Sequence, residues 1–167
     1  GPALFAGGSF TTAAGLPVQH IAKWNGSTWS GAGGGIVGGT NSNAWVACFA
    51  AFDDGTGPQL FTGGSFWSIG GVATAGIARW DGTRWRALGE GLNQFVGDAA
   101  VFDDGSGPAL YVAGNFTGAG SISVPNLVRR AGGAWSAVGA SLGSGVYALA
   151  VHDDGTGTAL FAGGAFY

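Results

Sequence analysis

A unit of about fifty residues recurs along this chain, and this recurrence constrains the fold more than any other feature. The phrase GPALFAGGSF at Gly1 returns as GPQLFTGGSF at Gly57, as GPALYVAGNF at Gly107 and as GTALFAGGAF at Gly157. Each unit of a repeat protein buries its apolar face against its neighbours. We therefore expect residues 1–167 to form a single repeat array.

The pattern inside one unit predicts an all-β fold. Short apolar runs alternate with glycine-rich turns, and no segment shows the 3.6-residue periodicity of a helix. We expect four strands per complete unit. The first is represented by residues 145–151, and the second by 3–6, 59–62, 109–112 and 159–162. The third covers 21–24, 77–80 and 127–130, and the fourth opens with Trp29, Trp85 or Trp135.

Glycines punctuate the predicted strands at fixed places. Asp-Gly pairs such as Asp154-Gly155 favour tight hairpins, because glycine adopts the positive φ that these turns require. The Gly-Gly or Ala-Gly that ends each second strand predicts a place where backbones approach closely. A longer loop follows that strand. The first pass contains six extra residues within 31–43, which we interpret as a lengthened loop.

These residues resemble kelch-type β-propeller repeats, in which a strand ending in Gly-Gly precedes a tryptophan by about 20 residues. The phrases FAGGSF and IARWDG are similar to glycine-rich propeller-like repeats of large secreted bacterial proteins. The resemblance implies kelch-like blades of four antiparallel strands and an extracellular or cell-surface location. It places a partial first blade at 1–50, further blades at 51–100 and 101–150, and the start of another at 151–167. Arg130 departs from the pattern, since Trp24 and Trp80 hold its position in the other units.

About three and a third blades, with thirteen predicted strands, cannot close a ring that needs four to eight. Two sheet edges are then expected to lack a partner strand. The segment from Phe161 to Tyr167 carries no charge and no proline, the residues that usually protect such an edge. We expect copies to associate through edge strands as a homo-oligomer or filament, or the remainder of a longer chain to complete the ring.

Composition excludes several classes of protein. Apolar residues make up 46% of the chain and include seven tryptophans, so disorder is not expected. The net charge is −3 and the six basic residues are scattered, which argues against nucleic acid as a partner. The longest apolar stretch, residues 44–52, is far shorter than a membrane span. Cys48 is the single cysteine, which rules out an internal disulfide, and its apolar neighbours predict a buried side chain.

Six of the nine acidic residues form a pair in each predicted hairpin, and these pairs are Asp53 and Asp54, Asp103 and Asp104, and Asp153 and Asp154. A calcium site is one interpretation, because hard cations take oxygen ligands from acidic, glycine-containing loops. Turn chemistry is the favoured one, since the pair recurs in every unit whereas an active site occurs once. No other cofactor is expected.

The remaining candidates occur once each. Trp67, present in one unit only, is the candidate for stacking on a glycan. Sequons begin at Asn25, in an accessible turn, and at Asn115, which we expect to be less accessible. His20 and His152 do not recur and form no metal motif. The predicted function is therefore a non-catalytic extracellular scaffold. A carbohydrate-binding propeller is the alternative, and a glycan-active enzyme using the unrepeated Asp81, Glu90 or Asp98 is the second alternative.

Overall fold

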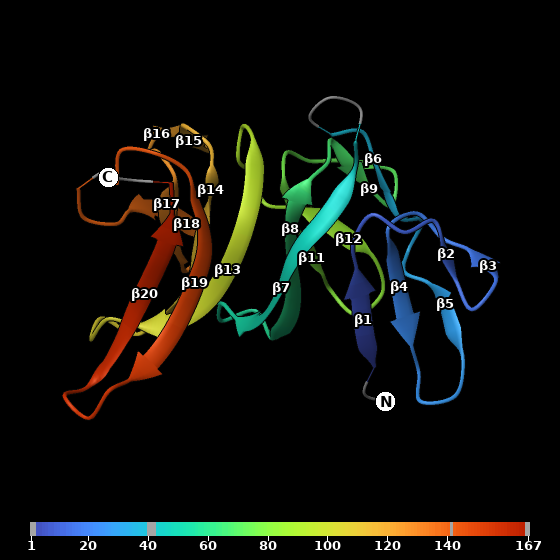
Figure 1. The fold of residues 1–167 in the computed structure, drawn as a ribbon, viewed down its shortest axis with the longest axis horizontal. Coiled ribbons are helices and arrows are strands. Elements are labelled where there is room, and N and C mark those ends of the chain that lie inside the picture. The colour runs from blue at the N-terminus through green and yellow to red at the C-terminus, as the bar shows by residue number, and fades with distance from the viewer. Residues whose placement is uncertain (1–2, 40–42, 141, 166–167) are drawn as a thin grey trace.

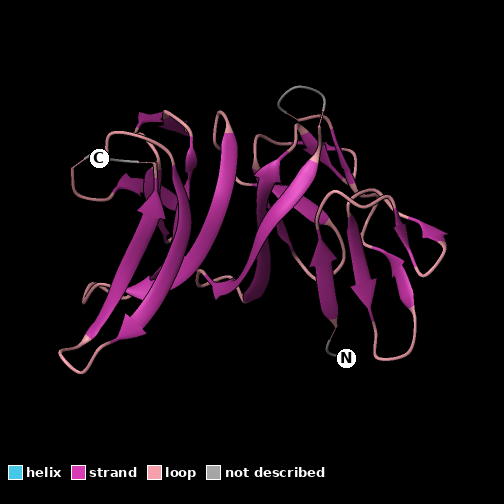
Figure 2. Cartoon of the chain, viewed as in Figure 1, coloured by secondary structure: helices cyan, strands magenta, loops and turns pink. Residues whose placement is uncertain are grey.

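A computed structural model describes residues 3–39, 43–140 and 142–165, and over these residues the chain is all-β (Figure 2). No described segment is helical, and none therefore qualifies as a helical membrane span. All strand pairs are antiparallel, and none of the sheets closes on itself within the described residues.

Seven sheets are present in the described residues, and the four that contain the predicted strands follow one another along the chain. Sheet 1 contains β1 (Leu4–Gly7), β4 (Ile21–Trp24) and β5 (Trp29–Gly31). Sheet 2 contains β7 (Trp45–Asp53), β8 (Pro58–Ser65), β11 (Ile77–Trp80) and β12 (Trp85–Ala87). Sheet 3 contains β13 (Phe95–Asp103), β14 (Pro108–Asn115), β17 (Leu127–Ala131) and β18 (Ala134–Ala137). Sheet 4 contains β19 (Val146–Asp153) and β20 (Thr158–Gly164).

The expected strands are all present among these four sheets, and each complete sheet has its strands in sequence order. Short strands that the sequence did not predict occupy the longer loops after β1, β8 and β14, and one more lies in the lengthened loop after β5. They are β2 (Thr12–Ala13), β3 (Leu16–Pro17), β6 (Ile36–Val37), β9 (Ser68–Ile69), β10 (Val72–Ala73), β15 (Gly118–Ala119) and β16 (Ile122–Ser123). The longer loop thus forms a small hairpin in the first three units, and β6 joins the hairpin of the second by pairing with β9.

The expected limits between units fall inside strands. β7, β13 and β19 cross the limits at 50, 100 and 150 because each pairs with the strand that follows it. The predicted lengthened loop at 31–43 contains β6, and its residues 40–42 lie outside the described residues.

The four sheets stack side by side, from sheet 1 in blue to sheet 4 in red (Figure 1). β13 packs against β7 and β8 on one side and against β19 on the other. The apolar clusters accordingly lie between neighbouring sheets: Val46 and Trp85 are buried between sheets 1 and 2, and Val96 and Phe116 between sheets 2 and 3. Stability therefore comes from contacts between adjacent units, as in other repeat arrays.

The first long strand of sheets 2, 3 and 4 carries a β-bulge at the same place. The register shifts between Val46 and Cys48, and the same shift recurs at the equivalent positions of β13 and β19. Opposite the bulge, a Cβ atom at Gly64 would lie 2.2 Å from the carbonyl oxygen of Trp45. The second glycine of the Gly-Gly pair is required because the bulged backbone leaves no room for a side chain.

Candidate functional site

The sheets are joined by a valine that packs over a small residue of the preceding sheet. A Cβ atom at Gly7 would lie 2.3 Å from Val46 Cγ1, and one at Gly63 would lie 2.4 Å from Val96 Cγ1. At the third junction Ala113 and Val146 are both fully buried in one cluster. The first residue of the Gly-Gly or Ala-Gly pair is therefore the position against which the valine of the next sheet packs.

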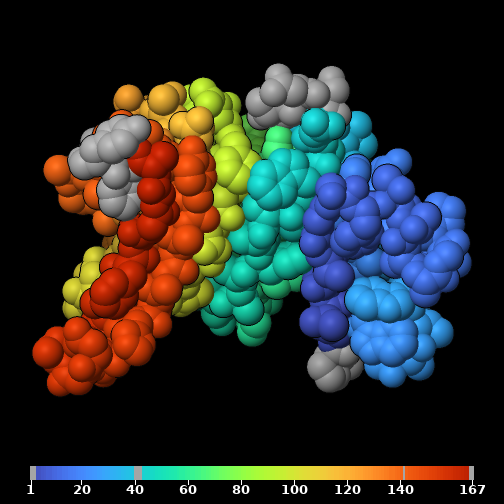
Figure 3. Space-filling model, in the orientation of Figure 1, coloured from blue at the N-terminus to red at the C-terminus, as the bar shows by residue number. Residues whose placement is uncertain are grey.

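In sheet 4 the corresponding residue is Gly163, and no described valine packs against it. A Cβ atom at Gly163 would have its nearest neighbour at 3.9 Å, the Cβ of Ala148. Phe161 on the same strand is 48% exposed, whereas the equivalent Phe61 is 1% exposed. The outer face of sheet 4 therefore carries the residues of a junction without a packed neighbour among the described residues. Sheet 4 lies at one end of the stack, in red and orange (Figure 3).

The outer face of sheet 1 carries the other half of such a junction. At the junction of sheets 1 and 2, the ring of Phe5 lies 6.1 Å from Trp80 and 6.4 Å from Trp85. The equivalent pair in sheet 1 is Trp24 and Trp29, with ring centroids 5.4 Å apart, and both rings are partly exposed.

A hollow of about 260 Å³ lies beside Trp29 on this outer face. In sheet 2 the matching space is filled by the preceding unit, because the indole Nε1 of Trp85 donates a 2.8 Å hydrogen bond to the carbonyl of Ala32. The amide of Gly70 likewise donates to the carbonyl of Gly35 at 2.7 Å. The hollow is therefore the place that a preceding unit occupies at the internal junction.

The acidic pairs close the hairpins. Asp53 Oδ1 accepts hydrogen bonds from the amides of Gly55 and Gly57 at 2.9 and 3.0 Å. Asp54 Oδ1 accepts from the amide and the hydroxyl of Thr56 at 3.3 and 2.6 Å. Asp103 and Asp104 make the same bonds in sheet 3, as do Asp153 and Asp154 to Gly155 and Thr156 in sheet 4. Within the described residues no three His, Cys, Asp or Glu side chains gather where a metal ion could bind.

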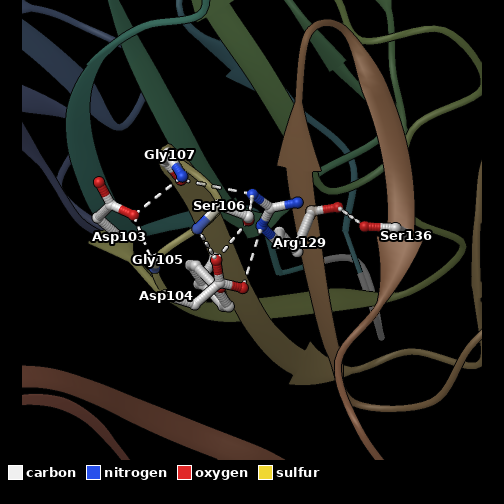
Figure 4. Close-up of polar contacts among 8 residues, drawn as sticks. Asp103, Asp104, Gly105, Ser106, Gly107, Arg129 and Ser136 are labelled. Atoms are coloured by element: carbon white, nitrogen blue, oxygen red, sulfur yellow. Dashed lines mark hydrogen bonds and ion pairs between the residues drawn. The ribbon is translucent and has the colours of Figure 1, made fainter.

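Figure 4 shows the hairpin of sheet 3, where the acidic pair also reaches a neighbouring strand. Asp104 Oδ2 accepts from the hydroxyl of Tyr111 at 2.9 Å and lies 3.7 Å from Arg129 Nε. The hydrogen bond from the Ser106 hydroxyl, followed by that from Tyr111, lowers the pKa of Asp104 to about 2. The charged carboxylate therefore holds this turn against β14 and β17.

The unrepeated acids serve separate structural purposes. Asp98 lies at the bulge of β13, and its Oδ2 accepts a 2.8 Å hydrogen bond from the amide of Leu149 in sheet 4. Asp81 accepts a 2.7 Å bond from Arg86 Nε and others from its own turn, and the bond from Arg86 is the largest cause of its lowered pKa. Glu90 lines a hollow beside Trp135.

The predicted single-residue sites differ in their surroundings. Trp67 is 52% exposed, and one side of its ring lies against Gly38, where a Cβ atom would come within 2.2 Å. Asn25 is exposed, and its Oδ1 accepts hydrogen bonds from the amides of Ser27 and Thr28. The expectation that Asn115 is less accessible was wrong, because it is the exposed last residue of β14.

Cys48 is buried as predicted, and burial raises the pKa of its thiol to about 12. His20 has φ of 66°, which it shares with Gly76 and Asn126 at the equivalent positions. The left-handed backbone favours glycine, asparagine and histidine, which are the three residue types at this position. His152 lies 6.2 Å from the ring of Phe161 and repeats the contact between Phe52 and Phe61.

Arg130 is accommodated within sheet 3. Its guanidinium lies 5.1 Å from the ring centroid of Trp135, directly opposite it on β18, and burial lowers its pKa. A cation–π contact thus replaces the indole pair of the other units. The strand pairing is unchanged.

No family model, curated protein or solved structure matches this chain.

Proposed function

We propose that this chain is a non-catalytic, extracellular repeat scaffold of kelch-like propeller blades that assembles with further copies of itself. The observation that carries the proposal is the exposure of Phe161, a residue whose equivalents Phe61 and Tyr111 are 1% and 2% exposed at junctions between sheets. Burying a phenylalanine contributes about 1.5–3 kcal/mol, so this face favours contact with a further unit, supplied by a second copy or, alternatively, by the remainder of a longer chain.

A second copy offers the matching surface. At the junction of sheets 1 and 2, Phe5 contacts the indole pair of the next sheet, so Phe161 of one copy would contact Trp24 and Trp29 of another. β20 contains no charged residue and pairs on one side only among the described strands. An unprotected edge of this kind favours strand addition. Copies joined this way form a ring if the rotation closes and a filament if it does not.

The acidic residues support a structural function over catalysis. Asp53, Asp103 and Asp153 each accept backbone hydrogen bonds within a turn, and Asp98 links sheet 3 to sheet 4. A catalytic pair of carboxylates needs both groups to face one substrate. Hydrogen bonding of these carboxylates within the fold leaves a binding or scaffold function as the better explanation.

Light scattering after size-exclusion chromatography tests the assembly, together with electron micrographs of the same sample. We expect particles well above the 16.4 kDa of one chain, and Phe161→Asp should shift them to single chains. Val151→Asp is the matched control. Val151 is 41% exposed but pairs with Leu160, so its side chain lies on the opposite face of the sheet from Phe161. A wild-type protein that remains a monomer at high concentration would overturn the proposal.

A further inference from the structure

Several residues that depart from the repeat lie at the junction of sheets 1 and 2, whereas Arg130 and Asp98 depart from it in other parts of the fold. His20 stands where the other units have Gly76 and Asn126, and Trp45 stands where the next unit has Phe95. The six-residue lengthening of the loop also falls here. Features that recur in each unit serve the fold, whereas departures that converge on one place indicate a function of that place.

These residues surround a hollow of about 670 Å³. This volume is in the range of pockets that hold small ligands, about 300–1,000 Å³. The polar and aromatic side chains that line it are Ser9, Thr11, Gln19, His20, Asn43 and Trp45. None of the described lining residues is Asp, Glu, Lys or Arg, so the pocket offers hydroxyl, amide and imidazole groups without a fixed charge.

Trp45 forms a rigid aromatic wall of this pocket. One face of its ring stacks on Phe95, with centroids 4.9 Å apart and planes 25° from parallel. The side chain remains 38% exposed. Because the stacked face fixes the orientation of the ring, the indole is preorganised for a ligand on the pocket side.

His20 is fixed by its backbone. Its amide donates to the carbonyl of Phe10 at 3.0 Å, and its carbonyl accepts from the amide of Gly8 at 3.1 Å. Its ring nitrogen Nδ1 is buried and has no hydrogen-bond partner in the structure. The backbone hydrogen bonds therefore hold His20 at the wall of the pocket, while the buried Nδ1 atom is not itself open to a ligand.

We propose that this pocket binds a neutral carbohydrate. A sugar ring has a face of C–H groups, which stacks on the exposed side of Trp45, and a rim of hydroxyls, which hydrogen-bond to Gln19, His20 and Asn43. The absence of charged lining residues selects against sulfated, phosphorylated and sialylated sugars. The residues that line the site do not include Phe161, Trp24 or Trp29, which form the two assembly faces.

Trp67 is a positioning residue in this site. Its amide donates a 3.0 Å hydrogen bond to the carbonyl of Val37, and its ring lies against Gly38. Both of these contacted residues line the pocket, but Trp67 does not. The exposed indole therefore supports the wall of the pocket from outside.

The test is a screen of neutral and anionic oligosaccharides, followed by calorimetric titration of the best neutral ligand into the wild-type protein and its variants. We expect Trp45→Ala to weaken binding about tenfold or more, as loss of an aromatic stacking surface does. His20→Asn should weaken it roughly three- to tenfold, because asparagine tolerates the positive φ, as Asn126 shows, but removes the imidazole. Tyr147→Ala is the matched control, since Tyr147 is 47% exposed beside Phe95 but does not line the pocket.

If Trp45→Ala does not fold, Trp45→Phe replaces it, because the next unit carries phenylalanine there, and a smaller loss of affinity is expected. The proposal is overturned if no neutral sugar binds, if the best ligand is anionic, or if Tyr147→Ala weakens binding as much as Trp45→Ala. Loss of binding in Trp67→Ala with normal binding in Trp45→Ala would place the site at Trp67 and would also overturn it. A monomeric wild-type protein that binds neutral sugar would refute the assembly proposal alone.

Discussion

Val96 of β13 lies so close to Gly63 of β8 that a methyl group at Gly63 would be 2.4 Å from Val96 Cγ1. The same valine-over-small-residue contact joins sheets 1 and 2 at Gly7 and Val46. Because these contacts bring the first strand of one sheet against the second strand of the preceding one, they set the distance between successive units. Adding one methyl group at such a contact would therefore force the two neighbouring sheets apart, because the interior is closely packed.

Replacing Gly63 by alanine should destabilise the protein by about 1–3 kcal/mol, the usual cost of overpacking a core. The added methyl group would meet Val96 and also Cys48 Sγ, which lies 2.9 Å from its position. Urea unfolding monitored by tryptophan fluorescence measures the effect. Gly163→Ala is the matched control, because its nearest neighbour is 3.9 Å away and little change is expected. Equal destabilisation by the two variants would contradict the close packing of Val96 against Gly63.

The stability of the fold should fall between about pH 4 and pH 2 as Asp104 is protonated. Its pKa is lowered to about 2, so its charged form is favoured in the folded state relative to an unfolded value near 3.9. A group with a lowered folded pKa contributes stability that is present above the unfolded pKa and lost as the pH falls towards the folded one.

Tyr111→Phe should make this part of the pH profile shallower, because it removes one of the hydrogen bonds that lower the pKa of Asp104. Thermal melting at half-unit steps from pH 5 to pH 2 measures the slope. Tyr147→Phe is the control, since no hydrogen bond joins its hydroxyl to any of the acidic hairpins described. An unchanged slope in Tyr111→Phe would show that Asp104 does not carry this dependence.

Cys48 should be inert in the native protein. Burial raises the pKa of its thiol to about 12, and the thiolate is the form that reacts with disulfide reagents. We expect no reaction with an aromatic disulfide reagent at pH 8 and reaction of one thiol per chain in guanidinium chloride. Rapid labelling of the native protein would show that β7 opens locally and that the sheet 2 core is less stable than its packing indicates.

The repeat and its turns predicted the long strands because both signals are local. Alternating apolar runs predict a strand and Asp-Gly predicts a turn, and neither signal depends on contacts with distant parts of the chain. The bulge opposite Gly64 was not predicted as such, because it depends on how two strands pair, although the glycine itself was recognised as a place of close approach. The small hairpins such as β9–β10 were missed since two-residue strands carry no periodicity.

The pocket at the junction of sheets 1 and 2 was not predicted either. Its wall comes from Trp45 and its polar groups include Gln19 and His20, which lie more than twenty residues away in the sequence. Only their departure from the repeat distinguished them. Trp67 was selected by that criterion, and the structure places it beside the pocket rather than in its lining.

The acidic hairpins give a test that separates turn chemistry from calcium binding. Asp53 Oδ1 accepts from the amides of Gly55 and Gly57, and the side-chain oxygen of asparagine can accept the same bonds. Asp53→Ala should therefore cost about 1 kcal/mol, whereas Asp53→Asn should cost less. Calcium added to the chelator-treated wild-type protein should leave its melting temperature unchanged. A calcium-dependent rise in melting temperature that both variants abolish would instead identify the pair as a metal site, because a metal requires the charged carboxylate that both substitutions remove.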